Sequence, residues 1–442
     1  MHSPVPVRPD GPADDPPVGG APPRSGRGQA TKRRNRLTGH CRAPYPDGRG
    51  CFHDRGLPRV LAPPINHDHR KRAGEPCDSY GVDSQGHDET PASQTARRLR
   101  RQAVACAHLG SPLYAELLDH AADDLLSGGP TAEVLAGNLA DPWRSALALR
   151  MLGGVHALVL TGRAPDLAVF YPSAGGTAAP GPGGGDAWAA LRRLLAEQPD
   201  AIRSWLGRPP QTNEVGRAAA LLGGLRQVVA EARLPVRLVE IGASAGLNLR
   251  ADRFCVPGDA GSYGDPSSPV VLTSGWRGQP PPDAPVEVIE RTGGDRAPID
   301  PATPHGRLTL AAYVWPDQPD RMARLRGAFA VAAAIPADLR REAASDTVHR
   351  TVLAEGSWTV LWHSIVRQYL DDAQRTAVAD RIAMLGADAT PAARFAYLFL
   401  EPHRPTAESE CLVSLTTWPG GDQRIIGTAP PHGLPTTWKQ QE

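Results

Sequence analysis

A short glycine loop, Gly242-Ala-Ser-Ala-Gly246, carries the pattern that points most directly to chemistry. It follows an apolar run that ends near Glu240, and a helix-like pattern follows it. A loop that passes from a strand into a helix lets a ligand approach the backbone closely, where amide groups and the positive end of the helix face it. We therefore expect this loop to bind a small molecule through its main chain; the alternative is a tight turn without a ligand.

Polar side chains near this loop are candidates for the same ligand. Ser244, Ala245 and Asn248 could offer amides or side-chain groups to a carboxylate or phosphate. Glu240 lies within the apolar run, where an acid is costly to bury unless it pairs or contacts a ligand. After the next apolar run, acids could accept hydrogen bonds from ribose hydroxyls. The predicted cofactor-binding residues are Glu240, Gly242, Ala243, Ser244, Ala245, Gly246, Asn248, Glu290 and Asp295.

Two further polar residues accompany apolar runs of strand type. His363 follows the run at 358–362, and Glu401 ends the run at 394–401. If both runs are parallel strands, their carboxyl ends meet at the same crevice as the glycine loop. His363 would then place a titratable side chain in that crevice, while a hydrogen-bonded structural histidine is the alternative.

The glycine loop also matches G-x-S-x-G, the pattern of the nucleophile elbow in α/β hydrolases. Ser244, Asp388 and His403 stand in the order in which that fold carries its catalytic triad. Two observations oppose a serine hydrolase. The elbow normally follows several strands, whereas the chain before Val236 has helical patterns, and no upstream His-Gly-Gly segment supplies an oxyanion hole. The hydrolase therefore ranks second to an enzyme that binds a nucleoside cofactor.

The elements that must position these residues change type near residue 236. Helical spacing of apolar residues occurs before it, at 96–126, from Thr131, at 143–161, at 187–196 and at 214–232. After it, strand-like runs occur at 237–241, 286–290, 358–363, 394–401, 411–417 and 423–428, with helical patterns at 305–315, 318–334 and 366–385. This alternation predicts an α/β fold with a mostly parallel sheet covered on both faces. The last two runs predict an antiparallel hairpin that closes one edge, and residues 254–284 form an insertion.

Composition divides the 442-residue chain into three parts. The 46 glycines and 46 prolines indicate that part of the chain is not packed. Residues 1–92 have few apolar positions and no sustained period, so they cannot bury enough surface to offset the entropy of ordering. We predict a disordered extension at 1–94, a helical domain at 95–205 and a Rossmann-like domain at 206–442. The extension is an interaction tail, a plain solvated segment or the product of a start site placed too early.

Charge and hydropathy exclude several classes of partner. The formal net charge is +1 and only Lys32, Lys71 and Lys439 are lysine, so no surface for nucleic acid is expected. No run approaches the roughly 20 apolar residues of a membrane span, and the N-terminus has no apolar core of a secretory signal. We expect a soluble cytoplasmic protein without nucleic-acid or membrane partners; its oligomeric state is not indicated.

The cysteines predict neither disulfides nor a metal site. They are scattered without close pairs, so we expect free thiols. Cys41, Cys51, His53 and Cys77 could be grouped as a zinc cluster, but no C-x2-C pair is present and the surroundings are rich in proline and glycine. Coincidence explains this grouping better than metal. The six cysteines are Cys41, Cys51, Cys77, Cys106, Cys255 and Cys411.

Residues from about 97 to 438 resemble the bacterial family known as domain of unknown function 2332. The motifs that carry the resemblance are Cys106–Tyr114, Gln211–Arg217, Leu238–Leu249, Val314–Gln318 and Trp362–Ser364. That family is similar to class I S-adenosylmethionine-dependent methyltransferases, which implies a Rossmann-like, mostly parallel seven-stranded sheet with a final antiparallel hairpin. It also implies that Glu240, Gly242, Ser244 and Gly246 lie on the cofactor loop, with 211–214 entering the site. Residues 345–353 lack the Gly-Asp pair usual before the fourth strand, so adenine contacts are not indicated there.

The resemblance implies methyl transfer to an unknown acceptor, with S-adenosylmethionine as cofactor and no metal. Such an enzyme acts mainly by holding a nucleophile within about 3–3.5 Å of the methyl group, on axis and away from water. His363 would deprotonate an oxygen or nitrogen acceptor, with Glu401 or Asn213 orienting it; these three are the predicted catalytic residues. A third possibility is a degenerate, non-catalytic relative that binds the cofactor, or nothing, and serves as an interaction protein.

Overall fold

The computed structural model describes residues 90–142, 145–178, 186–258, 261–403 and 410–439. The predicted extension up to residue 89, and the grouping of Cys41, Cys51, His53 and Cys77, lie outside the described residues. The first described helix begins at Pro91.

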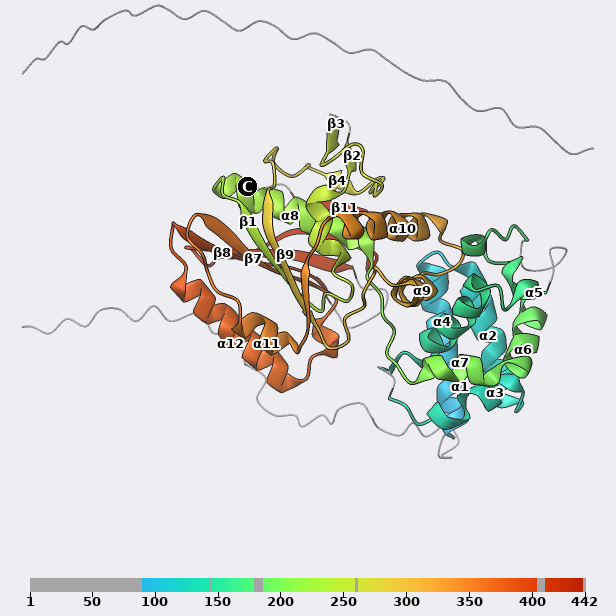
Figure 1. Cartoon of the computed structure of the whole chain (residues 1–442). Coiled ribbons are helices and arrows are strands. Elements are labelled where there is room, and N and C mark those ends of the chain that lie inside the picture. The colour runs from blue at the N-terminus through green and yellow to red at the C-terminus, as the bar shows by residue number, and fades with distance from the viewer. Residues whose placement is uncertain (1–89, 143–144, 179–185, 259–260, 404–409, 440–442) are drawn as a thin grey trace, which may run out of the picture. The chain divides into compact units, whose positions relative to one another are not determined.

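The chain before residue 207 is helical, as its apolar spacing predicts. The pair predicted at 96–126 is confirmed, with its break at Gly110, where φ is +83°. Proline begins most of these helices, at a position where its missing amide has no helical partner to lose. Their apolar side chains share one hydrophobic core, and they form one group in Figure 1. The helices are α1 (Pro91–His108), α2 (Pro112–Leu126), α3 (Pro130–Leu135), α4 (Leu147–Leu160), α5 (Pro165–Ala168), α6 (Ala187–Glu197) and α7 (Pro199–Leu206).

A nine-stranded sheet follows, in the order β4-β11-β10-β9-β8-β7-β1-β5-β6. Five strands are parallel and neighbours: β6 (Asp338–Arg341), β5 (Val288–Asp295), β1 (Val236–Ile241), β7 (Ser357–Ser364) and β8 (Ala393–Pro402). Next to them lie β9 (Cys411–Trp418) and β10 (Gln423–Ala429), an antiparallel pair, then β11 (Thr436–Trp438) and β4 (Trp276–Gly278). The mostly parallel sheet and the hairpin are confirmed.

The prediction of seven strands is wrong, and the hairpin does not close an edge. β11 pairs with β10, and β4 then pairs with β11, so the sheet continues beyond the hairpin. β4 belongs to the predicted insertion, which also holds the small hairpin of β2 (Val256–Gly258) and β3 (Gly261–Tyr263). The insertion therefore returns to the far edge of the sheet.

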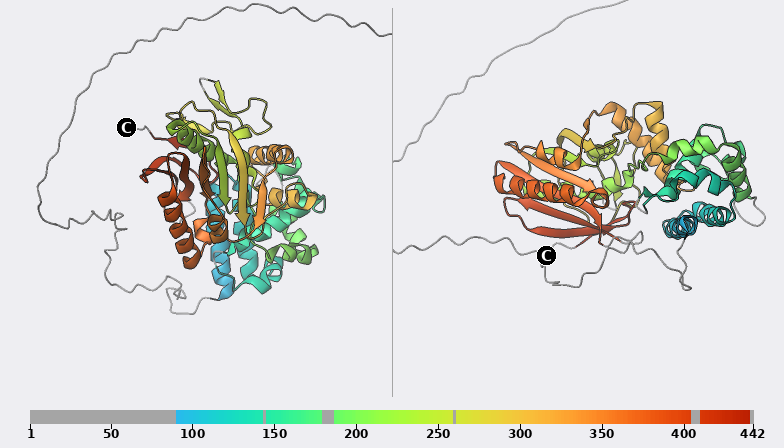
Figure 2. Two further views of the ribbon diagram at one scale, coloured as in Figure 1. Left: turned by 60° about the vertical axis from the view of Figure 1, so that its left-hand side comes forward. Right: turned by 90° about the horizontal axis from the view of Figure 1, so that it is seen from below.

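Helices cover both faces of the sheet. On one, the α8 face, lie α8 (Ala218–Glu231), the 3-10 helix η5 (Leu247–Arg253), α9 (Pro304–Ala312) and α10 (Pro319–Ala334). On the other, the α12 face, lie α11 (Ala344–His349) and α12 (Asp372–Asp388). Figure 2 shows the sheet between these layers. The predicted cover on both faces is confirmed.

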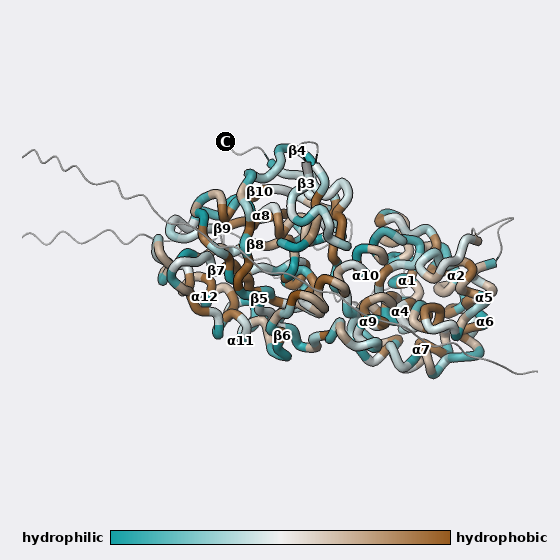
Figure 3. The backbone as a smooth tube through the Cα atoms, turned by 45° about the horizontal axis from the view of Figure 1, so that its top comes forward, coloured by the Kyte–Doolittle hydropathy of each residue, from teal (hydrophilic) through white to brown (hydrophobic). Residues whose placement is uncertain are grey.

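Alternation along each strand decides which side chains reach which face. Leu238 belongs to the core of the α8 face, whereas Val239 and Ile241 belong to that of the α12 face. By the same alternation, Trp362 reaches the α8 face and Leu361 the α12 face. Figure 3 shows the hydrophobic residues gathered along these strands. Within the described ranges no helix is both long and apolar enough to cross a membrane.

The centre of the sheet contains a topological switch point. β1 is followed in the chain by β5 on one side, while β7 lies on its other side. In open parallel sheets, ligands bind beyond the carboxyl ends of the strands at such a point. The loops after Ile241, Asp295 and Ser364 are therefore where a site is expected.

Candidate functional site

The glycine loop leaves β1 in a left-handed conformation at three positions. The φ angles of Gly242, Ser244 and Gly246 are +66°, +52° and +62°. A Cβ on Gly242 would also lie 2.6 Å from Val366 Cγ2. The loop leads into a 3-10 helix of seven residues rather than an α-helix. Glycine at 242 is thus required by backbone conformation and by the close approach of Val366.

Several amide groups in and after the glycine loop already have partners. Gly242 N and Ala243 N donate to Gly294 O, at 2.9 and 3.1 Å. Ser244 N donates to Asp295 Oδ2 at 2.9 Å, and Leu247 N donates to Asn213 Oδ1 at 2.8 Å. The loop therefore presents a carboxylate and a side-chain amide where an anion such as phosphate would otherwise bind.

Glu240 is buried at the end of β1 beside Trp362. Its side chain reaches the α8 face, the residue is 2% exposed, and among the described residues its Oε2 has no hydrogen-bond partner. Burial raises the pKa of Glu240 to about 8, although Trp362 and Arg250 act in the opposite direction. A buried carboxyl oxygen without a hydrogen-bond partner is costly, which makes Oε2 a candidate ligand contact.

An extended segment before α8 connects the loop to a neighbouring cavity. Gln211 accepts a hydrogen bond from Ser244 Oγ at 3.2 Å, and Asn213 bonds the amide of Leu247. Pro210, Thr212 and Glu214, which alternate with them, line the cavity. One stretch of backbone therefore touches the glycine loop with one side and the cavity with the other.

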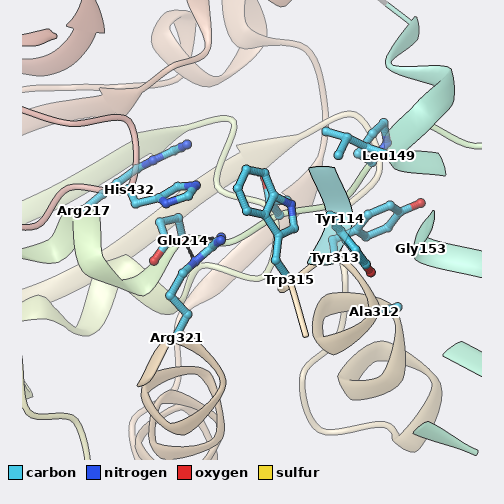
Figure 4. A pocket seen from close by; sticks show the side chains of 12 residues that line it. Tyr114, Leu149, Gly153, Glu214, Arg217, Ala312, Tyr313, Trp315, Arg321 and His432 are labelled. Atoms are coloured by element: carbon cyan, nitrogen blue, oxygen red, sulfur yellow. Dashed lines mark hydrogen bonds and ion pairs between the residues drawn. The ribbon is translucent and has the colours of Figure 1, made fainter. Parts of the chain in front are cut away.

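This cavity, called the Arg217 cavity below, has a volume of about 110 Å³ (Figure 4). Glu214 pairs with Arg321, whose Nε donates to Oε2 at 2.7 Å. Burial opposes the charge of Glu214, but Arg321, with His432 and Arg217, holds its pKa at about 2. Burial and the nearby Arg321 lower the pKa of His432 to about 3, so this imidazole is neutral, and its ring lies 5.3 Å from that of Trp315.

Arg217 is a site residue that the sequence analysis did not assign. Its Nε donates to Pro431 O at 3.0 Å, and its Nη1 donates to Ser364 O, at the end of β7, at 3.2 Å. Burial lowers the pKa of Arg217, with Glu214 acting in the opposite direction. The signal was present, because Arg217 ends the motif Gln211–Arg217, of which only the first four residues were placed near the site.

The structure brings His363 and Glu401 together, but not with Asn213. His363 Nδ1 lies 2.8 Å from Glu401 Oε1, and Nε2 lies 2.7 Å from the hydroxyl of Tyr397. His363 lines a cavity on the α12 face with residues of α12, whereas Glu240 reaches the α8 face. Asn213 bonds the glycine loop instead.

The predicted acids Glu290 and Asp295 lie toward opposite ends of β5, because this strand extends further than its predicted range. The strand predicted at 286–290 runs from Val288 to Asp295, so Asp295 lies at its carboxyl end. Glu290 pairs with Arg237 near the opposite end of β1, at 2.6 Å. Asn248 donates to Glu214 O at 3.2 Å.

The hydrolase triad is not assembled. Ser244 has the left-handed φ of a nucleophile elbow, but its Oγ donates to Gln211, and among the described residues no imidazole bonds it. His403 is exposed beyond the end of β8, whereas Ser244 is buried. Without a base, the hydroxyl of Ser244 has no activation.

A second cavity opens beside the loop on the side of Asp295. It has a volume of about 390 Å³ and is called the Ala245 cavity below. Its volume lies within the roughly 300–1,000 Å³ typical of small-molecule sites. Its walls are mostly apolar: Ala245, Arg250, residues 298–302, Ala332, Ala333, Pro336, Ala337 and Leu339.

Gly242→Ala is expected to destabilise the protein by about 1–3 kcal/mol, because the methyl group would meet Val366 and the left-handed φ would be strained. Thermal unfolding measures the loss. The control is Gly137→Ala, since no described atom lies within 4 Å of an added Cβ there. Equal melting of Gly242→Ala and the native chain would show that the loop conformation is not fixed.

Comparison with known proteins identifies the family. The chain belongs to the bacterial family described as "Uncharacterized protein conserved in bacteria (DUF2332)", which matches residues 96–438. The family predicted from the motifs is thereby confirmed. Neither a search of curated proteins nor a search of solved structures returns a match.

Proposed function

We propose that this member of the uncharacterised bacterial family binds S-adenosylmethionine at the carboxyl ends of β1 and β5 and transfers its methyl group to a small acceptor. The observation that carries the proposal is the set of polar groups at the switch point. The amides of Gly242, Ala243 and Ser244 are already bonded, and two acids, Glu240 and Asp295, lie at the carboxyl ends of neighbouring parallel strands. The switch point therefore offers two carboxyl groups beside amides that are mostly bonded.

Bonded amides and two nearby acids favour a nucleoside ligand without phosphate groups. A dinucleotide or a nucleoside triphosphate needs free amide groups for its phosphates. A sulfonium nucleoside has no phosphate and carries positive charge, which suits the buried carboxyl group of Glu240. Asp295 lies where an acid accepts hydrogen bonds from ribose hydroxyls in related sheets, and the apolar Ala245 cavity beside it suits a base.

The acceptor is assigned to the Arg217 cavity. Residues 210–214 contact both this cavity and the glycine loop, and the side chain of Glu240 lies on the same face of the sheet as α10, whose Arg321 lines the cavity. When bound, S-adenosylmethionine supplies an activated methyl group. The residues of the chain hold and orient the acceptor and exclude water, which is the main demand of such a reaction. The proposed transfer does not depend on His363, which lies on the α12 face.

Asp295→Asn is expected to weaken binding of S-adenosylmethionine about tenfold or more, because hydroxyl groups bond a charged acceptor more strongly than a neutral one. Titration calorimetry of the native chain and the variant measures the effect. Asp283→Asn is the matched control, since Asp283 is an exposed residue of the insertion that pairs with Arg226 of α8. This control should bind as the native chain does.

The same calorimetry decides against the proposal in two ways. Absence of heat with both S-adenosylmethionine and its demethylated product would remove the cofactor. Tighter binding of a dinucleotide or of ATP than of S-adenosylmethionine would show that the loop accepts phosphate and that its bonds to Asp295 and Asn213 are exchanged on binding.

A further inference from the structure

A cavity on the α12 face forms a site separate from the proposed cofactor site. It has a volume of about 290 Å³ and lies between α12 and the strands β7, β8 and β9. We call it the Tyr397 cavity. Apolar side chains make up the larger part of its wall, and polar side chains, among them His363, Arg367 and Tyr397, make up the rest. The residues that matter below are His363, Val366, Arg367, Arg375 and Tyr397.

Two of its polar residues, His363 and Tyr397, form a hydrogen-bonded chain with Glu401, which does not itself line the cavity. Glu401 Oε1 lies 2.8 Å from His363 Nδ1 and also accepts from the amides of Val366 and Arg367, at 2.9 and 3.3 Å. Burial opposes the charge, but these donors keep the pKa of Glu401 below its ordinary value. Because a carboxylate only accepts, Nδ1 carries a proton, and in the singly protonated ring Nε2 then accepts from the Tyr397 hydroxyl.

The arrangement is that of an acid, an imidazole and a hydroxyl group, as in hydrolytic triads. His363 is 3% exposed and stacks on Phe399, with ring centroids 5.5 Å apart, so its ring is fixed. Tyr397, in contrast, is only partly buried and reaches the cavity. The Tyr397 oxygen is therefore the end of the chain that a ligand can touch.

A strained residue maintains this chain. Ile365 directly follows β7 and has a φ of +53°, which is unusual for a β-branched side chain and costs about 1–3 kcal/mol. The turn that it makes directs the next two amides onto Glu401. Strain kept next to a fixed carboxylate points to a requirement other than stability.

We propose that the Tyr397 cavity binds a small, single-ring phenol or enol and that Tyr397, His363 and Glu401 ionise its hydroxyl group. The ligand hydroxyl donates to the Tyr397 oxygen. Its proton passes to that oxygen while the Tyr397 proton passes to Nε2 of His363. The products are a ligand oxyanion, a neutral tyrosine and an imidazolium paired with Glu401, so charge and protons balance.

The rim of the cavity favours the resulting anion. Arg367 lies 5.3 Å over the ring of Phe399, and Arg375 is held by bonds to Asp372 and to the carbonyl oxygen of Leu370. Both arginines are exposed and line the cavity. A volume of about 290 Å³ lies at the lower limit of small-molecule sites, which suits one ring rather than a larger ligand.

The test uses 4-nitrophenol, whose phenolate has its own visible absorption band. The native chain, without S-adenosylmethionine, is titrated at a pH below the pKa of the free phenol. We expect saturable binding with growth of the phenolate band. Tyr397→Phe should weaken binding or ionisation at least about tenfold, because the bridging oxygen is lost. Tyr369→Phe is the matched control, since Tyr369 is exposed and does not line the cavity.

Two further measurements keep the outcome decisive. Arg367→Gln alters an exposed rim residue and should reduce the phenolate band without affecting folding, which circular dichroism checks in each variant. No saturable binding to the native chain, or equal binding to folded Tyr397→Phe, would overturn the proposal. Because S-adenosylmethionine is absent, this result is independent of the proposed methyl transfer.

Discussion

Arg321→Met is expected to destabilise the folded chain by about 3–5 kcal/mol, since it leaves the charge of Glu214 buried without its main partner. Both side chains of this pair are largely buried, at 10% and 5% exposed, and their contact at 2.7 Å is charge-assisted. Urea or thermal unfolding near pH 7 measures the loss. The effect is large because the remaining carboxylate stays desolvated.

The stability loss caused by Arg321→Met is expected to depend on pH. The pKa of Glu214 is about 2 in the folded chain and near 4.5 without the fold, so its stabilising contribution is present above about pH 4.5 and disappears as the pH falls toward 2. The difference between Arg321→Met and the native chain should therefore shrink in acid. A double variant, Glu214→Gln with Arg321→Met, should recover part of the stability.

A surface pair supplies the control. Arg100→Met breaks an exposed contact with Asp123 and should change stability little. Equal losses for Arg100→Met and Arg321→Met would show that Glu214 is solvated and that the Arg217 cavity is open to water.

The sequence was sufficient for elements whose apolar pattern is local. The runs at 358–363, 394–401, 411–417 and 423–428 match β7 to β10 within one residue at each end. These strands are long and largely buried, so alternation and length identify them without knowledge of their neighbours. The glycine loop was predicted for the same reason, because a turn between strand and helix has a local signature.

The end of β5 could not be predicted because its residues are chosen by tertiary contacts. Gly293 and Gly294 pair with Glu240 and Ile241 of β1. A Cβ on Gly294 would lie 1.9 Å from Thr347 Oγ1, and one on Gly293 would lie 2.7 Å from the Cβ of Ala243. Glycine has low strand propensity, so a local analysis ends the strand too early. The predicted strand ended at Glu290, whereas in the structure the acid at the end of the strand is Asp295.

The short strands and the segment at 210–214, which lines the Arg217 cavity, could not be predicted from the sequence for a related reason. β4 and β11 have three residues each and pair across about 160 positions of the chain, so neither has a local pattern. β6 carries the charged sequence Asp338–Arg341 at the edge of the sheet, where charge protects against further pairing. The segment at 210–214 is neither helix nor strand, and its alternation between loop and cavity exists only in the folded chain.

The two buried glutamates of the α8 face, Glu214 and Glu240, differ in their partners and in the direction of their pKa shifts. Glu214 has a cationic partner and a lowered pKa, whereas Glu240 is buried without an ion pair among the described residues and has a raised pKa. The first contributes to stability at neutral pH, and the second reduces it. An acid that is retained at such a cost is best explained by a ligand that supplies the missing positive charge.

Glu240→Gln is therefore expected to make the ligand-free chain more stable than the native chain at pH 8, by up to about 4 kcal/mol. The folded chain keeps the Glu240 proton up to its pKa of about 8, whereas the unfolded chain releases it near 4.5. Native stability thus falls as the pH rises between these values. Glutamine has no proton to release, so the variant should lack this decline. Thermal unfolding between pH 5 and 8 measures both profiles.

As the pH rises toward 8, the affinity for S-adenosylmethionine should increase while the stability of the native chain decreases. Because a sulfonium cation attracts the ionised form of Glu240, the affinity of the native chain for S-adenosylmethionine should rise with pH toward 8, and Glu240→Gln should bind more weakly without that rise. Glu231→Gln, in an exposed pair with Arg424, is the matched control and should keep both native profiles. Parallel stability profiles of Glu240→Gln and the native chain would mean that Glu240 is already ionised in the folded protein, and the argument for a cationic ligand beside β1 would lose its basis.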